Sequence, residues 1–189
     1  YYGRIDDEDI YSIIAYIRTL EPIESEVPDS EPDFQMNFIL NTIPKKGEPT
    51  KKPDPSDQLA YGAYLSNASG CVECHTQVEK GSILKDRTFG GGREFGFPDG
   101  SVVRSSNISP DMETGIGSWT QEAFVSRFKM YADSGYVVPS VAAGEFNTIM
   151  PWTMYAQMTV EDLSAIYAYL ITIPARSNTV VKFSPPAPH

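Results

Sequence analysis

The chain has 189 residues, of which 41% are hydrophobic, so it is long enough to bury a core of its own. Its 15 Lys and Arg against 25 Asp and Glu give a formal net charge of −10, which argues against nucleic acid as a partner and favours a basic protein surface. The sequence contains no apolar run of roughly eighteen residues that would span a bilayer, and no charged-then-apolar signal segment at its start.

The chain contains an internal repeat, with one copy in its first part and one in its last. Residues 2–17 align without a gap with residues 155–170, and in both copies a capping residue, Asp6 or Thr159, precedes an acidic first turn. Apolar residues then follow at the spacing of one buried helical face, namely Ile10, Ile13, Ile14 and Ile17 in the first copy and Leu163, Ile166, Tyr167 and Leu170 in the second. We therefore expect residues 1–22 to be the closing helix of a preceding, related domain. A chance match between two amphipathic helices is the alternative.

Residues 23–57 are rich in proline and mixed in charge, which predicts an extended connector. Five of its residues are too apolar for free solution, and we expect them to lie across a domain surface. They are Phe34, Met36, Phe38, Ile39 and Leu40.

Residues 58–174 are expected to form one complete helical domain. A short helix over residues 58–65, with Leu59 facing inward, leads into a cysteine motif, and residues 76–117 contain enough Gly, Pro and Asn to predict a long ordered loop. Residues 175–189 form a proline-rich tail that we expect to be mobile.

A second helix is predicted later in this domain. Ser118 and Gln121 have the spacing of a capping box, and the apolar period continues to about Ala132. The helix is expected to bury Trp119, Phe124, Phe128 and Tyr131.

The segment Cys71-Val-Glu-Cys74-His75 carries the chemistry of the chain. Two cysteines three residues apart on one helical turn can add their thiols to the two vinyl groups on one edge of a porphyrin. The adjacent imidazole of His75 then lies beneath the iron. The motif predicts a covalently attached c-type haem with His75 as the proximal ligand.

Three other uses of the cysteine pair are less consistent with the sequence. A thioredoxin-like dithiol needs a strand-to-helix setting, whereas a helix and Ser-Asn-Ala-Ser-Gly precede Cys71. A zinc site needs four ligands, and besides the two cysteines and His75 the chain offers only His189. A disulfide between such close neighbours would be strained and would close almost no loop.

An electron-carrying haem needs a ligand on the opposite face, and methionine is usual where a high reduction potential is required. Among the six methionines, Met150 stands out because it precedes Pro151, lies in non-helical chain and follows a loop, residues 144–149, that could cover the far face of the haem. Met154 is the reserve candidate. Core packing is the alternative role for either methionine.

Several further motifs give the chain a specific resemblance. They are Gly90-Gly-Gly, Ser106-Asn-Ile-Ser-Pro-Asp111, Thr114-Gly-Ile-Gly-Ser-Trp119-Thr, Met150-Pro-Trp152, Tyr155 and Glu161-Asp-Leu-Ser-Ala-Ile-Tyr-Ala-Tyr-Leu170. In combination they resemble the multihaem cytochrome c subunits of membrane-bound alcohol, aldehyde and gluconate dehydrogenases and related dihaem cytochromes. The resemblance covers most of residues 58–174, and residues 1–22 repeat its closing helix.

The resemblance implies an all-α, class I cytochrome c fold with long ordered loops, Met150 as axial ligand, and a periplasmic or otherwise exported location. It implies that Asn107, Ile108 and Trp119 surround the haem and its propionates, with Arg104 as a further propionate neighbour. One Cys-x-x-Cys-His motif predicts one haem c in this chain. A second haem is expected in a preceding domain that the chain does not cover.

The function expected from these features is single-electron transfer between redox partner proteins in a periplasmic respiratory or dehydrogenase chain, without catalysis by this chain. A haem enzyme or sensor is the alternative, with an open sixth iron site for peroxide or a gas. A haem domain that only docks a dehydrogenase to its partner is a third possibility. Donor, acceptor and membrane tethering are left open by the sequence.

Overall fold

The computed structural model describes residues 2–142 and 144–186. The chain divides into two compact units, residues 1–52 and 53–189, and each is described by itself. Across the described residues, no helix is both long and apolar enough to cross a membrane.

The first unit contains a 3₁₀ turn, η1 (Tyr2–Arg4), and two helices, α1 (Asp7–Ile17) and α2 (Phe34–Thr42). Asp6 caps α1 as predicted, because its carboxylate accepts a hydrogen bond from the Glu8 amide at 3.0 Å. The Lys52 amide donates to the same carboxylate at 2.7 Å, and the Lys52 ammonium group lies 2.6 Å from Asp9. These backbone bonds lower the pKa of Asp6 and fasten the end of the connector along the start of α1.

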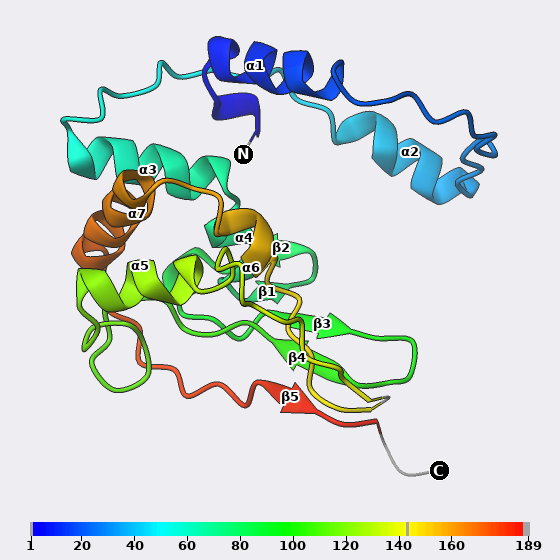
Figure 1. Ribbon diagram of the computed structural model, residues 1–189. Helices are drawn as coiled ribbons and strands as arrows, with labels where there is room; N and C mark the ends of the chain where they lie inside the picture. The colour runs from blue at the N-terminus through cyan, green and yellow to red at the C-terminus, as the bar shows by residue number, and fades with distance from the viewer. Residues whose placement is uncertain (1, 143, 187–189) are drawn as a thin grey trace. The chain divides into compact units, whose positions relative to one another are not determined.

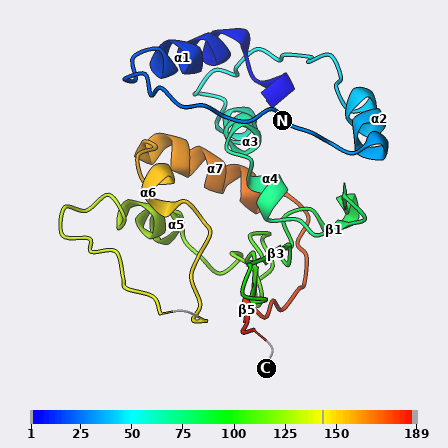
Figure 2. The ribbon, with the colours of Figure 1, turned by 90° about the vertical axis from the view of Figure 1, so that its right-hand side faces the viewer.

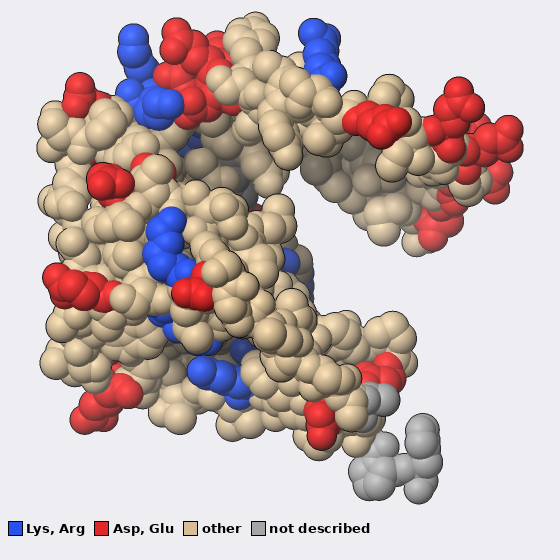
Figure 3. All heavy atoms as spheres, viewed as in Figure 1, with Lys and Arg blue, Asp and Glu red and all other residues tan. Residues whose placement is uncertain are grey.

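The prediction of an extended connector is wrong for residues 34–42, which form α2. Asp33 caps this helix by accepting a hydrogen bond from the Met36 amide at 2.7 Å, and no proline interrupts the nine residues that follow. The apolar side chains of α2 are exposed, Phe34 and Phe38 most of all. Figure 3 shows acidic side chains gathered over the chain between α1 and α2, where the sequence has six Asp and Glu from residue 21 to residue 33.

The second unit is built on two crossing helices, α3 (Gln58–Ala68) and α7 (Val160–Thr172), which lie against each other in Figures 1 and 2. α5 (Gln121–Lys129) packs on α7. The buried cluster between them contains Phe89, Ile116, Phe124, Ile166 and Leu170. The second repeat copy therefore buries its apolar face, as its periodicity predicts, and Thr159 caps α7 by accepting from the Asp162 amide.

Gly62 sets the distance between α3 and α7. A Cβ atom at this position would lie 1.9 Å from the carbonyl oxygen of Ala165, so only glycine allows the helices to cross here. We predict that Gly62→Ala destabilises the domain by roughly 3 kcal/mol, because the helices must separate, although alanine favours a helix intrinsically. Equilibrium unfolding in urea measures the loss. Gly96→Ala, whose Cβ would meet no atom within 4 Å, is the control, and equal stability of the two variants would contradict the prediction.

The expected loop over residues 76–117 contains short strands. β1 (Val78–Glu79) pairs with β2 (Ser82–Ile83), η2 (Lys85–Arg87) follows, and β3 (Glu94–Gly96) pairs antiparallel with β4 (Val102–Arg104). β5 (Phe183–Ser184) adds to β4, so the start of the predicted mobile tail is part of a sheet. Residues 187–189 of that tail lie outside the described residues. The fold is helix-dominated, as expected for a cytochrome c, with two small sheets that the sequence did not predict.

Two details of the predicted helices are wrong. Thr120, not Ser118, caps α5, because its hydroxyl accepts from the Ala123 amide at 3.2 Å. α3 continues to Ala68, and Leu59 at its start is exposed. Of the residues expected to be buried by α5, Phe124 is buried, Phe128 and Tyr131 are partly buried, and Trp119 is 38% exposed.

Candidate functional site

The cysteine motif forms a separate turn of helix, α4 (Cys71–Cys74). Gly70 precedes it in a left-handed conformation (φ 66°), which lets the chain turn directly from α3 into α4. Both cysteines are free thiols. Cys71 packs partly against the core cluster, and Cys74 is exposed. The two thiols therefore come from one helical turn, one beside the core and one toward solvent.

The environment of Cys71 is apolar. Burial raises the pKa of the Cys71 thiol to about 11, and the nearby Ser66 hydroxyl opposes this rise. The thiol is therefore protonated at neutral pH in the chain without a bound group. The two cysteines are not joined in a disulfide, and within residues 2–142 and 144–186 no group of three or more His, Cys, Asp and Glu could hold a metal ion.

His75 is oriented by a backbone carbonyl. Its Nδ1 lies 2.7 Å from the Ser106 carbonyl oxygen, and because a carbonyl only accepts, Nδ1 carries the proton. Burial lowers the pKa of His75, which keeps the ring neutral. Nε2 is then left with its lone pair, the arrangement found for histidines that bind a metal through Nε2.

The glycine run before β3 places the Ser106 carbonyl at His75. Gly91 donates its amide to the His75 carbonyl at 2.8 Å, while Gly92 donates to Ser105 at 2.8 Å. A Cβ on Gly91 would lie 2.4 Å from the carbonyl carbon of Ser106, and Gly91 has a φ of 70°. Buried Thr76 adds a further tie, since its hydroxyl accepts from the Phe89 amide. The loop that orients His75 therefore depends on a close backbone approach at Gly91.

This close approach gives a testable expectation. Gly91→Ala should push the Ser106 carbonyl away from His75 and lower stability by about 2 kcal/mol, because both the left-handed backbone and the added methyl are unfavourable. Chemical unfolding of the variant against the wild type measures the loss, with Gly96→Ala as the control. A wild-type midpoint for Gly91→Ala would show that the loop adjusts without cost.

Arg93 anchors the cysteine helix α4 through Glu73. Its Nη1 donates to the Glu73 carbonyl at 2.6 Å and to the Glu73 carboxylate at 3.0 Å. The guanidinium also lies over the Phe95 ring, 5.6 Å from its centre. Sequence reasoning missed this residue, because a lone arginine after a glycine run carries no signal of its partner.

Asn107 links neighbouring loop segments through hydrogen bonds of its side chain. Its amide nitrogen donates to the Thr114 hydroxyl at 3.0 Å and to the Arg176 carbonyl at 2.6 Å, and its amide oxygen accepts from the Ser109 amide. Ile108 is partly buried against the core cluster. The structure therefore brings Asn107 and Ile108 beside Ser106, in the segment that orients His75.

Arg104 lies in the small sheet. Its Nε donates to Glu94 at 2.8 Å, and its Nη1 donates to the Ser184 hydroxyl at 2.8 Å and the Val181 carbonyl at 3.3 Å. These contacts hold β5 on β4, so the guanidinium is engaged by protein groups.

Met150 lies at the start of α6 (Trp152–Tyr155) and is partly buried, whereas Met154, within α6, is 73% exposed. The Tyr155 hydroxyl donates to the Ser69 carbonyl at 2.6 Å. This bond ties α6 to the turn that precedes Cys71, so the segment carrying Met150 is fastened next to the cysteine helix.

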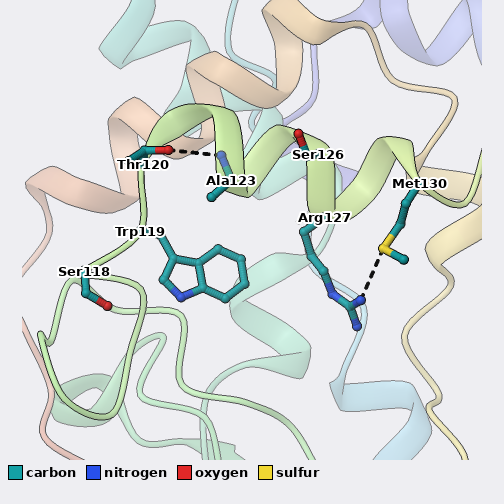
Figure 4. Close-up of a pocket in the computed structure, with 7 residues that line it drawn as sticks. All are labelled: Ser118, Trp119, Thr120, Ala123, Ser126, Arg127 and Met130. Carbon is teal, nitrogen blue, oxygen red and sulfur yellow. Dashed lines mark hydrogen bonds between the residues drawn. The ribbon is translucent and has the colours of Figure 1, made fainter.

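A cavity of about 570 Å³ lies along α5 (Figure 4). Its lining includes Trp119 and Arg127, with Ser118, Thr120, Ala123, Ser126 and Met130. The cysteines, His75 and Met150 do not line it. Of the residues predicted around the haem, only Trp119 faces this space.

One buried guanidinium nitrogen, that of Arg176, lacks a hydrogen-bond partner among the described residues. Arg176 follows α7, and its backbone is bound on both sides, because its amide donates to Ser109 and its carbonyl accepts from Asn107. Its Nε is buried and, among the described residues, has no hydrogen-bond partner. A buried guanidinium nitrogen of this kind calls for an acceptor such as a carboxylate. The donor set of thiols, neutral imidazole and this arginine fits a haem with propionate groups.

The chain is similar to several cytochrome c subunits of known dehydrogenases. The chain is 32% identical over 127 residues to the fructose dehydrogenase cytochrome subunit of Gluconobacter japonicus, covering 66% of this chain and 23% of that subunit. It is 33% identical over 122 residues to the cytochrome c subunit of the quinone alcohol dehydrogenase of Komagataeibacter europaeus, covering 63% and 23%. A dihaem cytochrome c-type protein of Cereibacter sphaeroides is 27% identical over 135 residues, covering 70% and 42%.

The matches thus span less than a quarter of the first two relatives. No protein-family model matches the chain. Homologues of this chain include cytochrome c subunits of dehydrogenases and a dihaem cytochrome c.

Proposed function

Because homologues of this chain are cytochrome c subunits, we propose that residues 58–174 form a c-type cytochrome domain that carries single electrons through one haem, with thioether bonds to Cys71 and Cys74. The observation that carries the proposal is the orientation of His75, whose Nδ1 is engaged by Ser106 and whose Nε2 remains for iron. The iron of such a haem supplies a one-electron couple. The chain itself would supply the thiols that attach the haem and the imidazole that binds its iron.

Residues of the chain would hold a haem at one edge and on one face. Two free thiols on α4 provide the attachment, and Arg93 holds α4 by bonds to the carbonyl and the carboxylate of Glu73. The Ser106 carbonyl increases the basicity of the proximal imidazole and fixes its plane. Rigid ligation of this kind keeps structural change small when the electron arrives.

Met150 is the proposed second ligand. Among the two candidates of this segment, it is the partly buried methionine, while Met154 is largely exposed. The bond from Tyr155 to Ser69 keeps the segment close to the cysteine helix. A thioether ligand opposite an imidazole favours ferrous iron and so raises the reduction potential.

The propionates would be received by residues around the same loops. Arg176, with its unpartnered buried Nε, is the best candidate for a charged partner. Trp119 lines the cavity and can donate through its indole nitrogen. Asn107 and Ile108 support the haem from the loop beside Ser106, whereas Arg104 would have to exchange its bonds to Glu94 and Ser184 to act as a propionate neighbour.

The proposal also covers the rest of the chain. α1 repeats α7, yet positions that α7 buries or partly buries are exposed in α1 at Ile13, Ile14 and Ile17. We assign residues 1–22 to the closing helix of another cytochrome c-like domain, which would hold a second haem, and residues 23–57 to a connector. Because its homologues are cytochrome subunits of dehydrogenases, the protein would act in the periplasm beside a dehydrogenase subunit.

The state of α1 tests this assignment. An eleven-residue helix with an exposed apolar face is marginal by itself, so its amides should exchange with solvent far faster than those of α7 in residues 1–189. Hydrogen exchange followed by mass spectrometry compares the two helices in one sample. Protection of α1 equal to that of α7 would contradict the need for a further partner helix.

The haem itself is tested on the protein produced with a c-type maturation system. Acid–acetone extraction should leave the haem with the chain, and the visible spectrum should be that of a low-spin, six-coordinate cytochrome in both oxidation states. A high-spin ferric spectrum would instead favour the enzyme or sensor with an open sixth site. Extraction of the haem into acetone would contradict covalent attachment.

A further inference from the structure

Met150 is enclosed in a short hydrogen-bonded turn. The Thr148 hydroxyl accepts from the Met150 amide at 3.2 Å and from the Trp152 indole nitrogen at 3.3 Å. The Trp152 amide in turn donates to the Met150 carbonyl at 2.8 Å. Because both peptide groups of Met150 and the indole are bonded within the turn, movement of the Met150 backbone is coupled to movement of the Trp152 ring.

The Trp152 ring is held against α5 and the chain that follows it. It stacks on Tyr131, with ring centres 5.1 Å apart and an interplanar angle of 12°, and it packs against Phe128 at 5.3 Å. The guanidinium of Arg127 lies 4.6 Å from the centre of the Trp152 ring and 5.4 Å from that of Tyr131. Arg127 thus contacts both members of the aromatic stack.

Arg127 has no competing acidic partner in the part of the chain that the structure describes. Its other contact is a hydrogen bond from Nη1 to the Met130 sulfur at 3.4 Å. A cation over an indole face is attracted most strongly when it is partly removed from water, and Arg127 is partly buried. The contact with the aromatic rings is therefore the main restraint on this side chain, and the side chain restrains the rings in return.

The far end of α6 is tied separately. Lys129 donates to the carbonyls of Ala156 and Met158, and Tyr155 donates to Ser69. Loss of Arg127 would therefore leave α6 attached while freeing the end that carries Met150. Removing Arg127 should therefore affect the position of Met150 without unfolding the domain.

We propose that Arg127 is a positioning residue for the axial ligand, which clamps Trp152 on Tyr131 and so holds the Met150 sulfur on the iron. This inference rests on the proposed ligation by Met150. When the clamp is removed, Met150 leaves the iron more often, and an added ligand competes more successfully for the sixth position.

The test is the affinity of the ferric holoprotein for imidazole, followed by visible absorption. Arg127→Gln should bind imidazole roughly tenfold more tightly than the wild type, since a cation–π contact of this kind is worth about one factor of ten. The weak far-red ferric band of methionine-ligated haem should also fade at a lower pH. Arg18→Gln, at the exposed C-terminal cap of α1, removes the same charge without touching the stack and should match the wild type.

Variants of the ring complete the test. Trp152→Phe keeps an aromatic face under Arg127 and should lie between the wild type and Trp152→Leu, which also serves if Arg127→Gln fails to fold. Wild-type imidazole affinity in both Arg127→Gln and Trp152→Leu would overturn the clamp. A wild type that is high spin and lacks the far-red band would instead overturn the Met150 ligation on which the inference rests, before any variant is compared.

Discussion

Replacing Cys71 and Cys74 together by alanine should abolish covalent haem binding, so that acid–acetone extraction removes all haem from the chain. The two thiols are the only sulfhydryl groups in the sequence, and both are free and lie on one helical turn. Each single variant should keep one thioether bond. Its reduced absorption band should shift to longer wavelength, because one vinyl group stays conjugated with the porphyrin.

The structure distinguishes the two single variants. Cys71 packs against the core cluster, so Cys71→Ala removes a partly buried sulfur as well as a bond and should unfold at lower denaturant concentration than Cys74→Ala. The loss expected from the missing sulfur is on the order of 1 kcal/mol. Intact-protein mass spectrometry counts the attached haem, and urea unfolding ranks stability. Retention of haem mass by the double variant would show that a different side chain forms the bond.

The sequence predicted the helices of the domain better than their packing. Capping residues and apolar period located α5 and α7 to within a few residues, because these signals are local. The crossing of α3 on α7 depends on Gly62 facing Ala165 more than a hundred residues later, and a glycine within a helix carries no such information by itself. The strands have two or three residues each, too few for an alternating pattern to be recognised.

The proline-rich connector shows how composition can hide local order. Proline on both sides of residues 34–42 suggested extended chain, yet Asp33 supplies a helix cap and the residues between are free of proline. Composition averages over a segment, whereas a cap acts on one turn. The apolar side chains of α2 are exposed, and the prediction that they lie across a domain surface stays untested.

In the candidate site, too, the sequence predicted the local motif but not the contacts between distant segments. Cys71, Cys74 and His75 are contiguous in sequence, so their spacing alone predicts a shared turn. The partner of His75 is a backbone carbonyl 31 residues away, and no side chain marks it. The glycine run and the Ser106-Asn-Ile motif identified the two segments involved, but only the structure shows that they approach each other at Gly91.

Met150→Ala should produce the largest change in the electronic properties of the haem. Loss of the thioether ligand should abolish the far-red ferric band, convert the ferric haem to a high-spin or water-ligated form, and lower the reduction potential by on the order of 0.1 V or more. The fold should persist, because the ties from Tyr155 and Lys129 hold α6 without Met150. Absorption spectroscopy and potentiometric titration of the holoprotein measure both effects.

Met154→Ala is the matched control, since Met154 lies four residues later and is largely exposed. It should keep the band and the potential of the wild type. Loss of the band in Met154→Ala and its retention in Met150→Ala would transfer the ligand role to Met154. Electron transfer from a donor protein separates the remaining functions: a carrier slows when Met150 is lost, whereas a domain that only docks its partners keeps its flux. The effect of losing Met150 on electron flux therefore distinguishes an electron carrier from a domain that only docks its partners.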